Sequence, residues 1–473
     1  MAATKQFAPV IAVAIIAALL VTFKWNSLSL PTYWDETYPY TYAANTMADH
    51  GPSVVPGVLP MELSKGHPPL FLFTASVWIC TFGNSMFSIH FLGMMFSVLL
   101  LFAVYALGKR IHSETAGVIA VLLLASRTLF IAQSSFLLPE IFLGLLSVLT
   151  IHAWISKKKV AFVIAASLLL LTKEPGIVLF TVLGICSLVT ELRAKAGLIT
   201  AVKKTIWMAV PLIPVTIFYL LQKQKTGAFF FGEHLDPAKV SHFTFKQIFF
   251  DTFCLQLFVY YGGIVSTIIA IAFAVYGFTK KAQVNSEQKH AITTLLIFIA
   301  AYLLFCGFTF PIARYLISAT APWCIIVAIG IVQLLSAWKK WAAYSLAILV
   351  AGVQLGYAYD VQTNSDHDLG YVHAVKAYQS AIDWCLKNGY QHQTIEAQQL
   401  FARATQSSVA GYVKENEEFT SVMNQHSGNI APQLFISCNV DANFDLYSND
   451  TTLTQVAVFE EGKCKIIAYK QRQ

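Results

Sequence analysis

Two adjacent carboxylates directly follow the first hydrophobic segment of this chain. Asp35 and Glu36 come after Trp34 and before Tyr38 and Tyr40. Aromatic residues are enriched where a protein crosses the edge of a bilayer, and ionisable residues in that setting commonly serve function. A carboxylate at such a position can take a proton from a hydroxyl group or bind a cation. The alternative is an acidic loop that is simply solvated.

Basic residues in three separate stretches could bind an anion. Lys65 and His67 precede two prolines that begin a helical segment, and the N-terminus of a helix attracts negative charge. Lys173 lies in a polar break between two apolar segments, and Arg314 with Tyr315 lies at the end of another. A guanidinium can hold a phosphate through two hydrogen bonds. The alternatives are proline- and glycine-rich turns and an arginine that reaches from a helix end to the interface.

Other ionisable residues are harder to interpret from their position alone. Glu140 follows a proline at the start of an apolar segment, where a first-turn carboxylate is also an ordinary helix feature. Arg127 lies inside an apolar segment, which is costly unless it faces a cavity or a partner, so it deserves a functional hypothesis. Glu233 and His234 are adjacent and could supply metal ligands, although two residues do not make a site.

The composition identifies an integral membrane protein. Of 473 residues, 56% are hydrophobic and 12% are charged, about half the charged share of soluble domains. The net charge of +7 does not indicate nucleic-acid binding, because most Lys and Arg residues lie in short loops between apolar segments. The eight cysteines are scattered, without a CxxC pair or zinc-type spacing.

The apolar segments predict an all-α bundle of about eleven transmembrane helices. Each is close to the length that spans a bilayer, and the candidates are residues 8–24, 87–107, 115–133, 141–156, 160–172, 176–190, 206–222, 253–278, 291–307, 316–336 and 342–358. A first loop, residues 25–85, separates the first two, and its amphipathic part at 69–81 is expected to lie on the membrane surface.

The basic loops predict the orientation of the bundle. If the spans alternate, all the clusters fall on one side, which the positive-inside rule makes cytoplasmic; they are Lys109-Arg110, Lys157-Lys158-Lys159, Arg193 with Lys195, Lys203-Lys204, Lys280-Lys281 and Lys339-Lys340. The N-terminus is then inside. The first loop, Glu140, Lys173, Arg314 and everything after residue 359 face outward.

The composition changes near residue 359, so we predict two domains. Residues 1–358 form the transmembrane catalytic domain, and residues 359–473 form a small outward-facing α+β domain. Residues 368–387 read as an amphipathic helix, and 433–438 and 455–471 read as strands, the latter a hairpin. Cys438 and Cys464 lie on these strands, where a disulfide and two free thiols are about equally expected.

In this order, the motifs resemble those of the GT-C superfamily of membrane glycosyltransferases. The similarity is to the branch of protein O-mannosyltransferases and lipid A aminoarabinose transferases, glycosyltransferase family 39-like, and it covers roughly residues 8–340. The motifs are Asp35-Glu36 with Tyr38, Tyr42 and Ala43, then His67-Pro68-Pro69-Leu70, Gly108-Lys109-Arg110, Glu140, Thr172-Lys173, Glu233-His234, and Arg314-Tyr315 with Pro322.

The resemblance implies a reaction and a site. The donor would be a sugar on a polyprenyl or dolichyl phosphate, Asp35 the candidate base and Glu140 a second acidic residue. Some relatives hold a metal with a Glu of the first loop and a His of a later outer loop; His234 matches the latter, and His67 or Gly66 stands where the former is expected. We therefore expect at most one cofactor, a divalent metal ion.

The expected chemistry is inverting transfer on the outer face of the membrane. Asp35, with Glu36 beside it, takes the proton of an acceptor hydroxyl, and that oxygen attacks the anomeric carbon opposite the phosphate. Lys65, His67, Lys173 and Arg314 with Tyr315 would bind the substrate, because a phosphate leaving group needs positive charge rather than a general acid. The tail of the lipid-linked donor is expected to lie among the helices.

Two alternatives stay open from sequence. A related enzyme could move a different lipid-linked group, such as an oligosaccharide. A transporter or flippase of lipid-linked sugar is a different class, which should show ionisable residues near the bilayer midplane and broken helices; only Arg127 fits that pattern. We expect a bacterial inner (plasma) membrane enzyme with no nucleic-acid partner. The sugar and the acceptor, whether envelope glycan, lipid or protein, are not determined.

Overall fold

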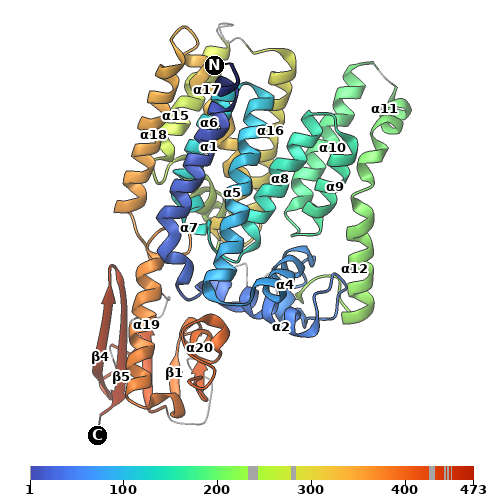
Figure 1. Cartoon of the computed structure of the whole chain (residues 1–473). Coiled ribbons are helices and arrows are strands. Elements are labelled where there is room, and N and C mark those ends of the chain that lie inside the picture. Colours follow the sequence, from blue (N-terminus) through green and yellow to red (C-terminus); the bar gives the residue numbers. More distant parts are fainter. Residues whose placement is uncertain are drawn as a thin grey trace.

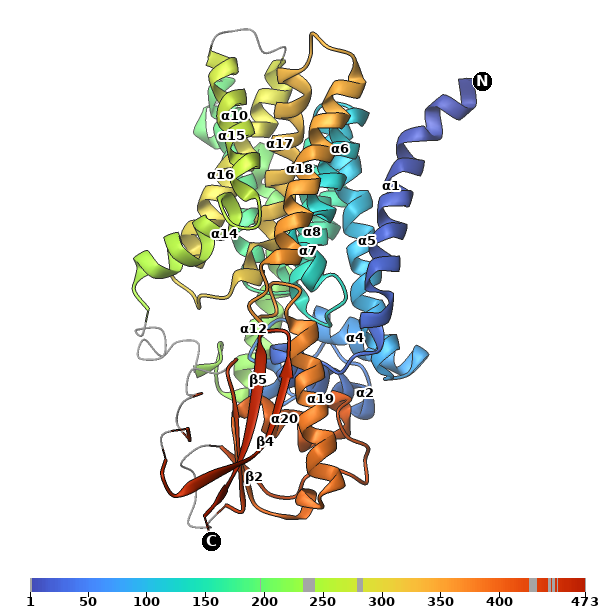
Figure 2. The ribbon, with the colours of Figure 1, turned by 90° about the vertical axis from the view of Figure 1, so that its left-hand side faces the viewer.

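A helical bundle and a small α/β domain make up the chain, with the N-terminus at the end of the bundle that lies away from that domain (Figures 1 and 2). The structure is a computed structural model. It describes residues 2–195, 197–232, 243–278, 284–424, 432–440, 444, 447–448 and 450–472. The prediction of a mostly helical membrane protein with a small C-terminal sheet is confirmed.

The bundle contains long helices linked by short irregular helical turns, marked η. In chain order its elements are α1 (Ala2–Lys24), η1 (Trp25–Ser29), η2 (Trp34–Glu36), η3 (Thr37–Thr41), α2 (Tyr42–His50), α3 (Met61–Ser64), α4 (Leu70–Phe82), α5 (Met86–Ile111), α6 (Glu114–Ala125), α7 (Thr128–Gln133), α8 (Pro139–Ile155), α9 (Lys159–Leu170), α10 (Gly176–Arg193), α11 (Leu198–Thr205), η4 (Ile206–Ala209), α12 (Leu212–Thr226), η6 (Gln247–Cys254), α14 (Leu255–Phe258), α15 (Gly263–Phe278), α16 (Ser286–Cys306), η7 (Ala313–Leu316), α17 (Ile317–Leu334) and α18 (Lys340–Asp360).

Among the described helices, six are long and apolar enough to cross a membrane, or up to eight if each bent helix pair is one span. The bent pairs are residues 198–209 with 212–226, at 57°, and 247–258 with 263–277, at 82°. The remaining three expected spans correspond to the shorter apolar helices α6, α8 and α9. The count of eleven and the inside N-terminus therefore stay predictions.

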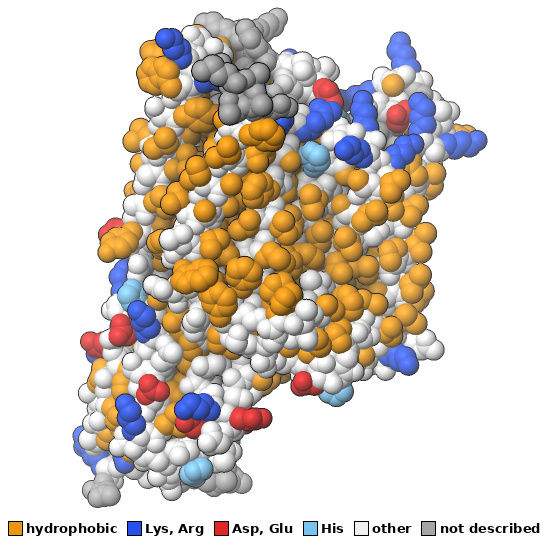
Figure 3. Space-filling view, viewed as in Figure 1, with side chains coloured by type: hydrophobic (Ala, Val, Ile, Leu, Met, Phe, Trp, Pro, Cys, Tyr) orange, Lys and Arg blue, Asp and Glu red, His pale blue; other side chains and the backbone are white. Residues whose placement is uncertain are grey.

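The surface pattern is that of a bundle in a bilayer. Figure 3 shows a broad hydrophobic belt around the middle of the bundle, with Lys and Arg side chains gathered above it and mixed charges on the domain below. The first loop, residues 25–85, covers the lower end of the bundle, where α2 and α4 lie beside α12 (Figure 1). The helix α4 has 13 residues, too few to span a bilayer without help, as expected for a surface segment.

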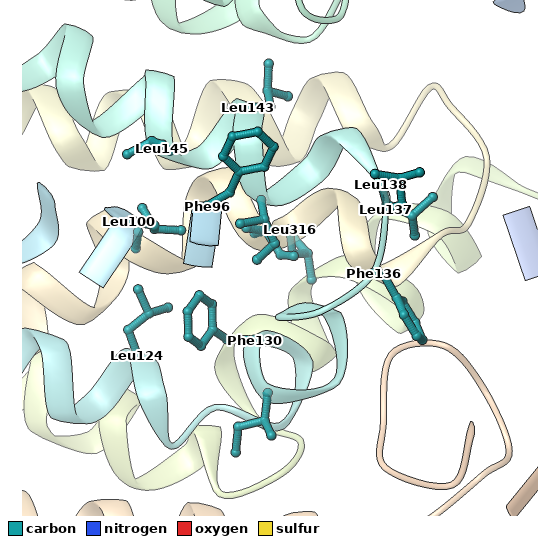
Figure 4. Packing of buried hydrophobic residues seen from close by; sticks show 14 of the residues in the cluster. Phe96, Leu100, Leu124, Phe130, Phe136, Leu137, Leu138, Leu143, Leu145 and Leu316 are labelled. Atoms are coloured by element: carbon teal, nitrogen blue, oxygen red, sulfur yellow. The ribbon is translucent and has the colours of Figure 1, made fainter. Parts of the chain in front are cut away.

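The core lies where α5, α6, α8 and α17 pack together. Phe96, Leu100, Leu124, Phe130 and Leu316 are all buried and meet at this crossing (Figure 4). Fully buried side chains of this size each contribute about 1.5–3 kcal/mol relative to exposure to water, although in a bilayer packing replaces part of that term.

Close approach of α5 and α6 requires glycine at their contact. A Cβ on Gly108 would lie 2.9 Å from the Cα of Gly117, closer than real Cβ atoms come. The two helices therefore approach backbone to backbone, as small residues allow in membrane bundles.

The C-terminal domain is a five-stranded sheet with helices. Its elements are α19 (Tyr371–Lys387), η8 (Tyr390–His392), β1 (Ile395–Ala397), α20 (Gln399–Thr405), η9 (Ser408–Ala410), β2 (Val422–Asn424), β3 (Leu434–Cys438), β4 (Leu453–Glu461) and β5 (Cys464–Gln471). The strand order is β2-β1-β3-β5-β4, with β1 parallel to β2 and β3, and β5 antiparallel to β3 and β4. The predicted amphipathic helix, strand and hairpin are thus all present.

Buried hydrogen bonds join this domain to the first loop. The Tyr33 hydroxyl donates to the carbonyl of Asn364 at 2.5 Å, and the Tyr412 hydroxyl donates to the carbonyl of Thr32 at 3.0 Å. The ammonium of Lys24, at the end of α1, donates to the Tyr371 hydroxyl at 2.6 Å. These hydrogen bonds hold the C-terminal domain against the loop that carries Asp35. A displacement of the domain would therefore displace the loop.

Two buried cysteines of the sheet are in contact. The sulfur of Cys438 lies 3.8 Å from that of Cys464, and both side chains are buried. The sequence left a disulfide and two thiols equally open, and the structure places the two sulfurs side by side without an S–S bond.

Candidate active site

Arg314 is the centre of a buried charge cluster assembled from four distant parts of the chain. Its guanidinium forms ion pairs with Asp35 of η2 and with Asp366, which lies between α18 and α19. Its Nε lies 3.6 Å from a carboxylate oxygen of Glu140 at the start of α8. The outer loop, η7, α8 and the C-terminal segment are brought together at this one side chain.

Lys173 completes the cluster from the break between α9 and α10. Its ammonium donates to Glu140 at 2.8 Å and lies 4.6 Å from the centre of the Tyr315 ring. Burial acts to lower the pKa of Lys173, but the Glu140 carboxylate together with Tyr40 and Tyr315 outweighs it and raises the pKa of Lys173 well above its usual value. Lys173 therefore stays charged over the physiological range.

The cluster contains more acid than base. Three carboxylates (Asp35, Glu140, Asp366) face two cations (Lys173, Arg314), so the group carries one formal negative charge. The side chain of Asp35 is 42% exposed, whereas those of Glu140 and Asp366 are 3% and 9% exposed. Asp35 is therefore the carboxylate of this cluster that a substrate can reach, and Arg314 holds it in place.

Glu140 keeps one oxygen without a partner. Its Oε2 is buried and has no hydrogen-bond partner within the described part of the chain, while Oε1 takes Lys173 and faces Arg314. A buried carboxylate oxygen normally accepts a hydrogen bond. A hydroxyl group of a bound substrate or a water molecule would satisfy it.

Glu36 points the other way from its neighbour and is wholly buried. One oxygen accepts a hydrogen bond from the backbone of Leu137 at 2.6 Å and lies 3.1 Å from Nε2 of His90; the other accepts from the backbone of Tyr33 at 3.3 Å. The sequence grouped Glu36 with Asp35 as catalytic. With both oxygens occupied inside the protein, Glu36 fastens the loop before α8 to η2 rather than facing a substrate.

The loop before α8 depends on a glycine in α5. A Cβ on Gly93 would lie 2.6 Å from the carbonyl oxygen of Phe136 and 2.8 Å from that of Ser135. The Ser97 hydroxyl, one turn further along, donates to the carbonyl of Ser134 at 2.7 Å. This close packing fixes the turn before α8 and therefore the position of Glu140.

A second group of charges lies beside the cluster, around Tyr38. The guanidinium carbon of Arg403, from α20 of the C-terminal domain, lies 3.8 Å from the centre of the Tyr38 ring. The ammonium of Lys65 lies 6.0 Å from the same ring and 4.8 Å from that of Phe231. Neither Lys65 nor Arg403 has an ion pair with a described residue. Two cations without a described carboxylate partner thus flank Tyr38, which lies three residues after Asp35 in the chain.

His67 and Glu174 form a pair outside the cluster. Nδ1 of His67 lies 2.8 Å from a carboxylate oxygen of Glu174, and the Tyr219 hydroxyl donates to the other oxygen at 3.4 Å. Burial acts to raise the pKa of Glu174, but His67, a backbone hydrogen bond and Lys173 together outweigh it and lower the pKa below the usual value. Lys173 and Glu174 are adjacent in the chain, but Lys173 pairs with Glu140 and Glu174 pairs with His67.

Arg127 caps a broken helix. One of its terminal nitrogens donates to the carbonyls of Gln256 at 3.0 Å and Leu257 at 2.8 Å, at the 82° bend between α14 and α15. Carbonyls at a helix end lack partners within the helix, and buried in a bundle they need a donor. Arg127 therefore supplies the donor that these two carbonyls need.

The candidate metal ligands cannot be placed. Glu233 and His234 lie outside the described residues. Within the ranges that are described, no three His, Cys, Asp or Glu side chains are grouped so that they could hold a metal ion. A metal at this site stays a prediction.

Sequence reasoning missed Asp366 and Arg403. Both follow the last hydrophobic segment, where the chain had been assigned to a separate domain without motifs. The available signal was the acidic loop Asn364-Ser365-Asp366-His367-Asp368 directly after that segment, which starts at the same membrane face as Asp35.

One family model matches part of the chain. Residues 66–220 match the family model of dolichyl-phosphate-mannose-protein mannosyltransferases. This match includes His67, Glu140 and Lys173 but neither Asp35 nor Arg314. A search of curated proteins finds no match.

Solved structures show the same fold over nearly the whole chain. ArnT from Cupriavidus metallidurans in the apo state is 13% identical, with 99% of this chain and 98% of that chain covered and a TM-score of 0.59. The same protein bound to undecaprenyl phosphate is 13% identical, with 96% and 97% covered and a TM-score of 0.56. The Archaeoglobus fulgidus oligosaccharyltransferase in complex with Zn and sulfate is 14% identical, with 85% and 61% covered and a TM-score of 0.50. The resemblance to GT-C membrane glycosyltransferases is confirmed.

Proposed function

We propose that this protein is an inverting glycosyltransferase that moves a sugar from a polyprenyl-phosphate donor to a hydroxyl acceptor on the outer face of the membrane. The observation that carries the proposal is Asp35, the one carboxylate of the Arg314 cluster that is exposed, near two cations that flank Tyr38 and have no described carboxylate partner, Lys65 and Arg403. The fold supports it, because ArnT, which has the same fold, has been solved with undecaprenyl phosphate.

Asp35 takes the proton from the acceptor hydroxyl. As that proton leaves, the acceptor oxygen forms a bond to the anomeric carbon of the sugar, and the bond from that carbon to the phosphate oxygen breaks. Polyprenyl phosphate leaves with the bonding electrons. Attack from the face opposite the leaving group inverts the configuration at the sugar carbon.

The charge distribution supports different halves of the site for the two substrates. The cluster around Arg314 is already negative by one charge, so it repels a phosphate and favours the neutral acceptor. The pair of cations around Tyr38 is positive and suits the phosphate. We therefore expect the phosphate to contact Lys65 and Arg403 rather than Lys173 and Arg314. Positive charge at that position stabilises the phosphate as a leaving group.

Lys173, Arg314 and Tyr315 then act as positioning residues. They hold Glu140 and Asp35 in fixed orientations before the substrate binds. No further conformational entropy of these two side chains is then lost on binding. His67 holds the turn before α4 through Glu174, close to Lys65. Glu36 positions Asp35 by fixing η2.

A divalent metal remains one part of the proposal. Its expected ligands are Glu233 and His234, and a metal bound near the phosphate would add positive charge to the leaving group. The Archaeoglobus fulgidus oligosaccharyltransferase was solved with Zn. The expected location is a bacterial inner membrane, with the C-terminal domain outside.

The proposal is tested in proteoliposomes with polyprenyl-phosphate sugars of known anomeric configuration. Transfer to an acceptor with the opposite configuration in the product, read by NMR, is the expected result. A product with retained configuration would contradict the mechanism. Movement of intact lipid-linked sugar across the bilayer, without cleavage, would favour a flippase instead; the comparisons do not favour that alternative.

A further inference from the structure

A large cavity with a basic lining lies at the other end of the bundle from the candidate active site. Its volume is about 630 Å³, and it is formed by the ends of α8 and α10, the starts of α9 and α16, and by α11 and η4. Cavities of this size hold small-molecule ligands in other proteins. Figure 3 shows Lys and Arg side chains gathered above the hydrophobic belt at this end. The catalytic proposal makes no use of this cavity.

The lining combines positive charge with aromatic rings. Five lysines and two glutamates are among the residues around it. Of the glutamates, Glu191 pairs with Lys204 at 2.7 Å, and Glu287 pairs with Arg110 at 2.7 Å. The other four lysines (Lys157, Lys158, Lys159 and Lys203) have no carboxylate partner among the residues that the structure describes. Like charges around one cavity repel each other, and a bound anion would relieve that repulsion.

The inner wall of the cavity is apolar and fixed. Nε1 of Trp154 donates to the hydroxyl of Ser187 at 2.8 Å, so its ring orientation is set. The ammonium of Lys159 lies 5.4 Å from the centre of the Trp207 ring. Tryptophan is the residue typical of the headgroup level of a bilayer. Cation and ring together form a wall that suits a ligand with both a charged and an apolar part.

Lipid-facing residues border the cavity. Val160, one residue after Lys159, is 75% exposed, and Ile206, one residue before Trp207, is 63% exposed. In a membrane such side chains contact acyl chains. A ligand whose headgroup lies in the cavity can therefore leave its tails in the bilayer without crossing a polar surface.

From these observations we infer that the cavity binds the headgroup of an anionic phospholipid. The phosphate lies among Lys157, Lys158 and Lys203, and the glycerol and first acyl carbons lie against Trp154 and Trp207. Basic pockets between transmembrane helices at this level are suited to such headgroups. A phosphate free in solution shares the charge but would gain nothing from the apolar wall.

Lipid binding is measured by native mass spectrometry of the delipidated full-length protein. Phosphatidylglycerol is titrated against phosphatidylcholine, and inorganic phosphate and glycerol phosphate are tested as soluble competitors. The wild type should prefer phosphatidylglycerol by about tenfold or more at low salt and lose most of that preference at high salt. Equal binding of both lipids, or displacement by millimolar inorganic phosphate, would overturn the inference.

A matched pair of variants locates the site. Lys158→Ala with Lys203→Ala removes two charges from the cavity, and Lys339→Ala with Lys340→Ala removes two exposed charges at the start of α18, outside the cavity lining. The first variant should bind phosphatidylglycerol about ten to thirty times more weakly, and the second should bind like wild type. An equal loss in both would show general surface attraction and not this cavity. If the first variant does not fold, Lys158→Ala and Lys203→Ala are measured singly against Lys339→Ala, and binding unchanged in both cavity variants would overturn the inference.

Discussion

Arg314 and Asp366 form a buried ion pair that ties the start of α17 to the segment leading into the C-terminal domain. The same guanidinium holds Asp35 of the first loop. The candidate active site is thus completed by a residue from beyond the last transmembrane helix. A bundle without its C-terminal segment would leave Arg314 with one carboxylate fewer and Asp35 less firmly held.

Asp366→Asn should lower the rate of transfer without abolishing it. The variant keeps the size of the side chain and removes the charge that shares Arg314, so Asp35 is held less precisely. By analogy with groups that orient catalytic ligands, we expect kcat to fall about 10- to 100-fold. The KM for the donor should change little, because Asp366 lies in the acidic half of the site. A large rise in KM with unchanged kcat would contradict this role.

Lys65→Met and Arg403→Met should weaken donor binding. These cations flank Tyr38 and have no described carboxylate to neutralise them, so each loses a phosphate contact when truncated. We expect the affinity for polyprenyl phosphate to fall about tenfold in each variant, as measured by titration in detergent. Lys414→Met is the control, since Lys414 is an exposed cation of the same domain as Arg403. A loss in the control as large as in Arg403→Met would mean that only net charge matters.

Glu36→Gln should destabilise the protein. The change breaks a buried carboxylate network with two backbone donors and His90, and losses of about 3–5 kcal/mol are typical when one partner of a buried charged pair is removed. We expect a lower melting temperature, with residual transfer by the folded fraction. A variant that is as stable as wild type but inactive would instead restore Glu36 to a catalytic role.

Glu174 should make stability depend on pH in the acid range. Its pKa is lowered in the folded protein, because His67, a backbone hydrogen bond and Lys173 together outweigh the opposing effect of burial. The folded state then gains stability above the unfolded pKa of about 4.3, and this gain is lost as the pH falls through the lower folded value. Melting temperatures between pH 3 and 7 should fall less steeply in Glu174→Gln than in wild type. Parallel curves would contradict the contribution of this pair.

The sequence predicted which residues lie at the same end of the bundle better than it predicted the contacts of single residues. Asp35, Glu140, Lys173 and Arg314 were expected on one face, and they meet there. Placing the basic loops on the opposite face was enough to predict that, because alternating helices leave few choices.

The direction of each side chain could not be predicted in the same way. Asp35 and Glu36 are neighbours in a tight turn, and one reaches solvent while the other is buried. Which one does so depends on the packing of Gly93 against the loop before α8, a contact between residues 43 positions apart. No local pattern encodes such a contact.

The partners of the cations were also beyond the reach of the sequence. Lys173 and Arg314 were expected to be free for phosphate, yet each already has a carboxylate. Arg127 was noted as costly in a membrane, and its contacts with the carbonyls of Gln256 and Leu257 depend on a helix break far along the chain. Such pairings follow from tertiary contacts rather than from residue type.

The most direct test of the central claim is sugar transfer by Asp35→Asn. Membranes that contain the protein are supplied with radiolabelled polyprenyl-phosphate sugars, and wild type is compared with this variant and with Asp49→Asn, which removes an exposed carboxylate from the same loop. We predict transfer by the wild type and by Asp49→Asn, and a loss of about 10²–10⁴-fold in folded Asp35→Asn, the usual contribution of a general base. Normal transfer by Asp35→Asn would show that Asp35 is only a solvated loop residue and would contradict the account.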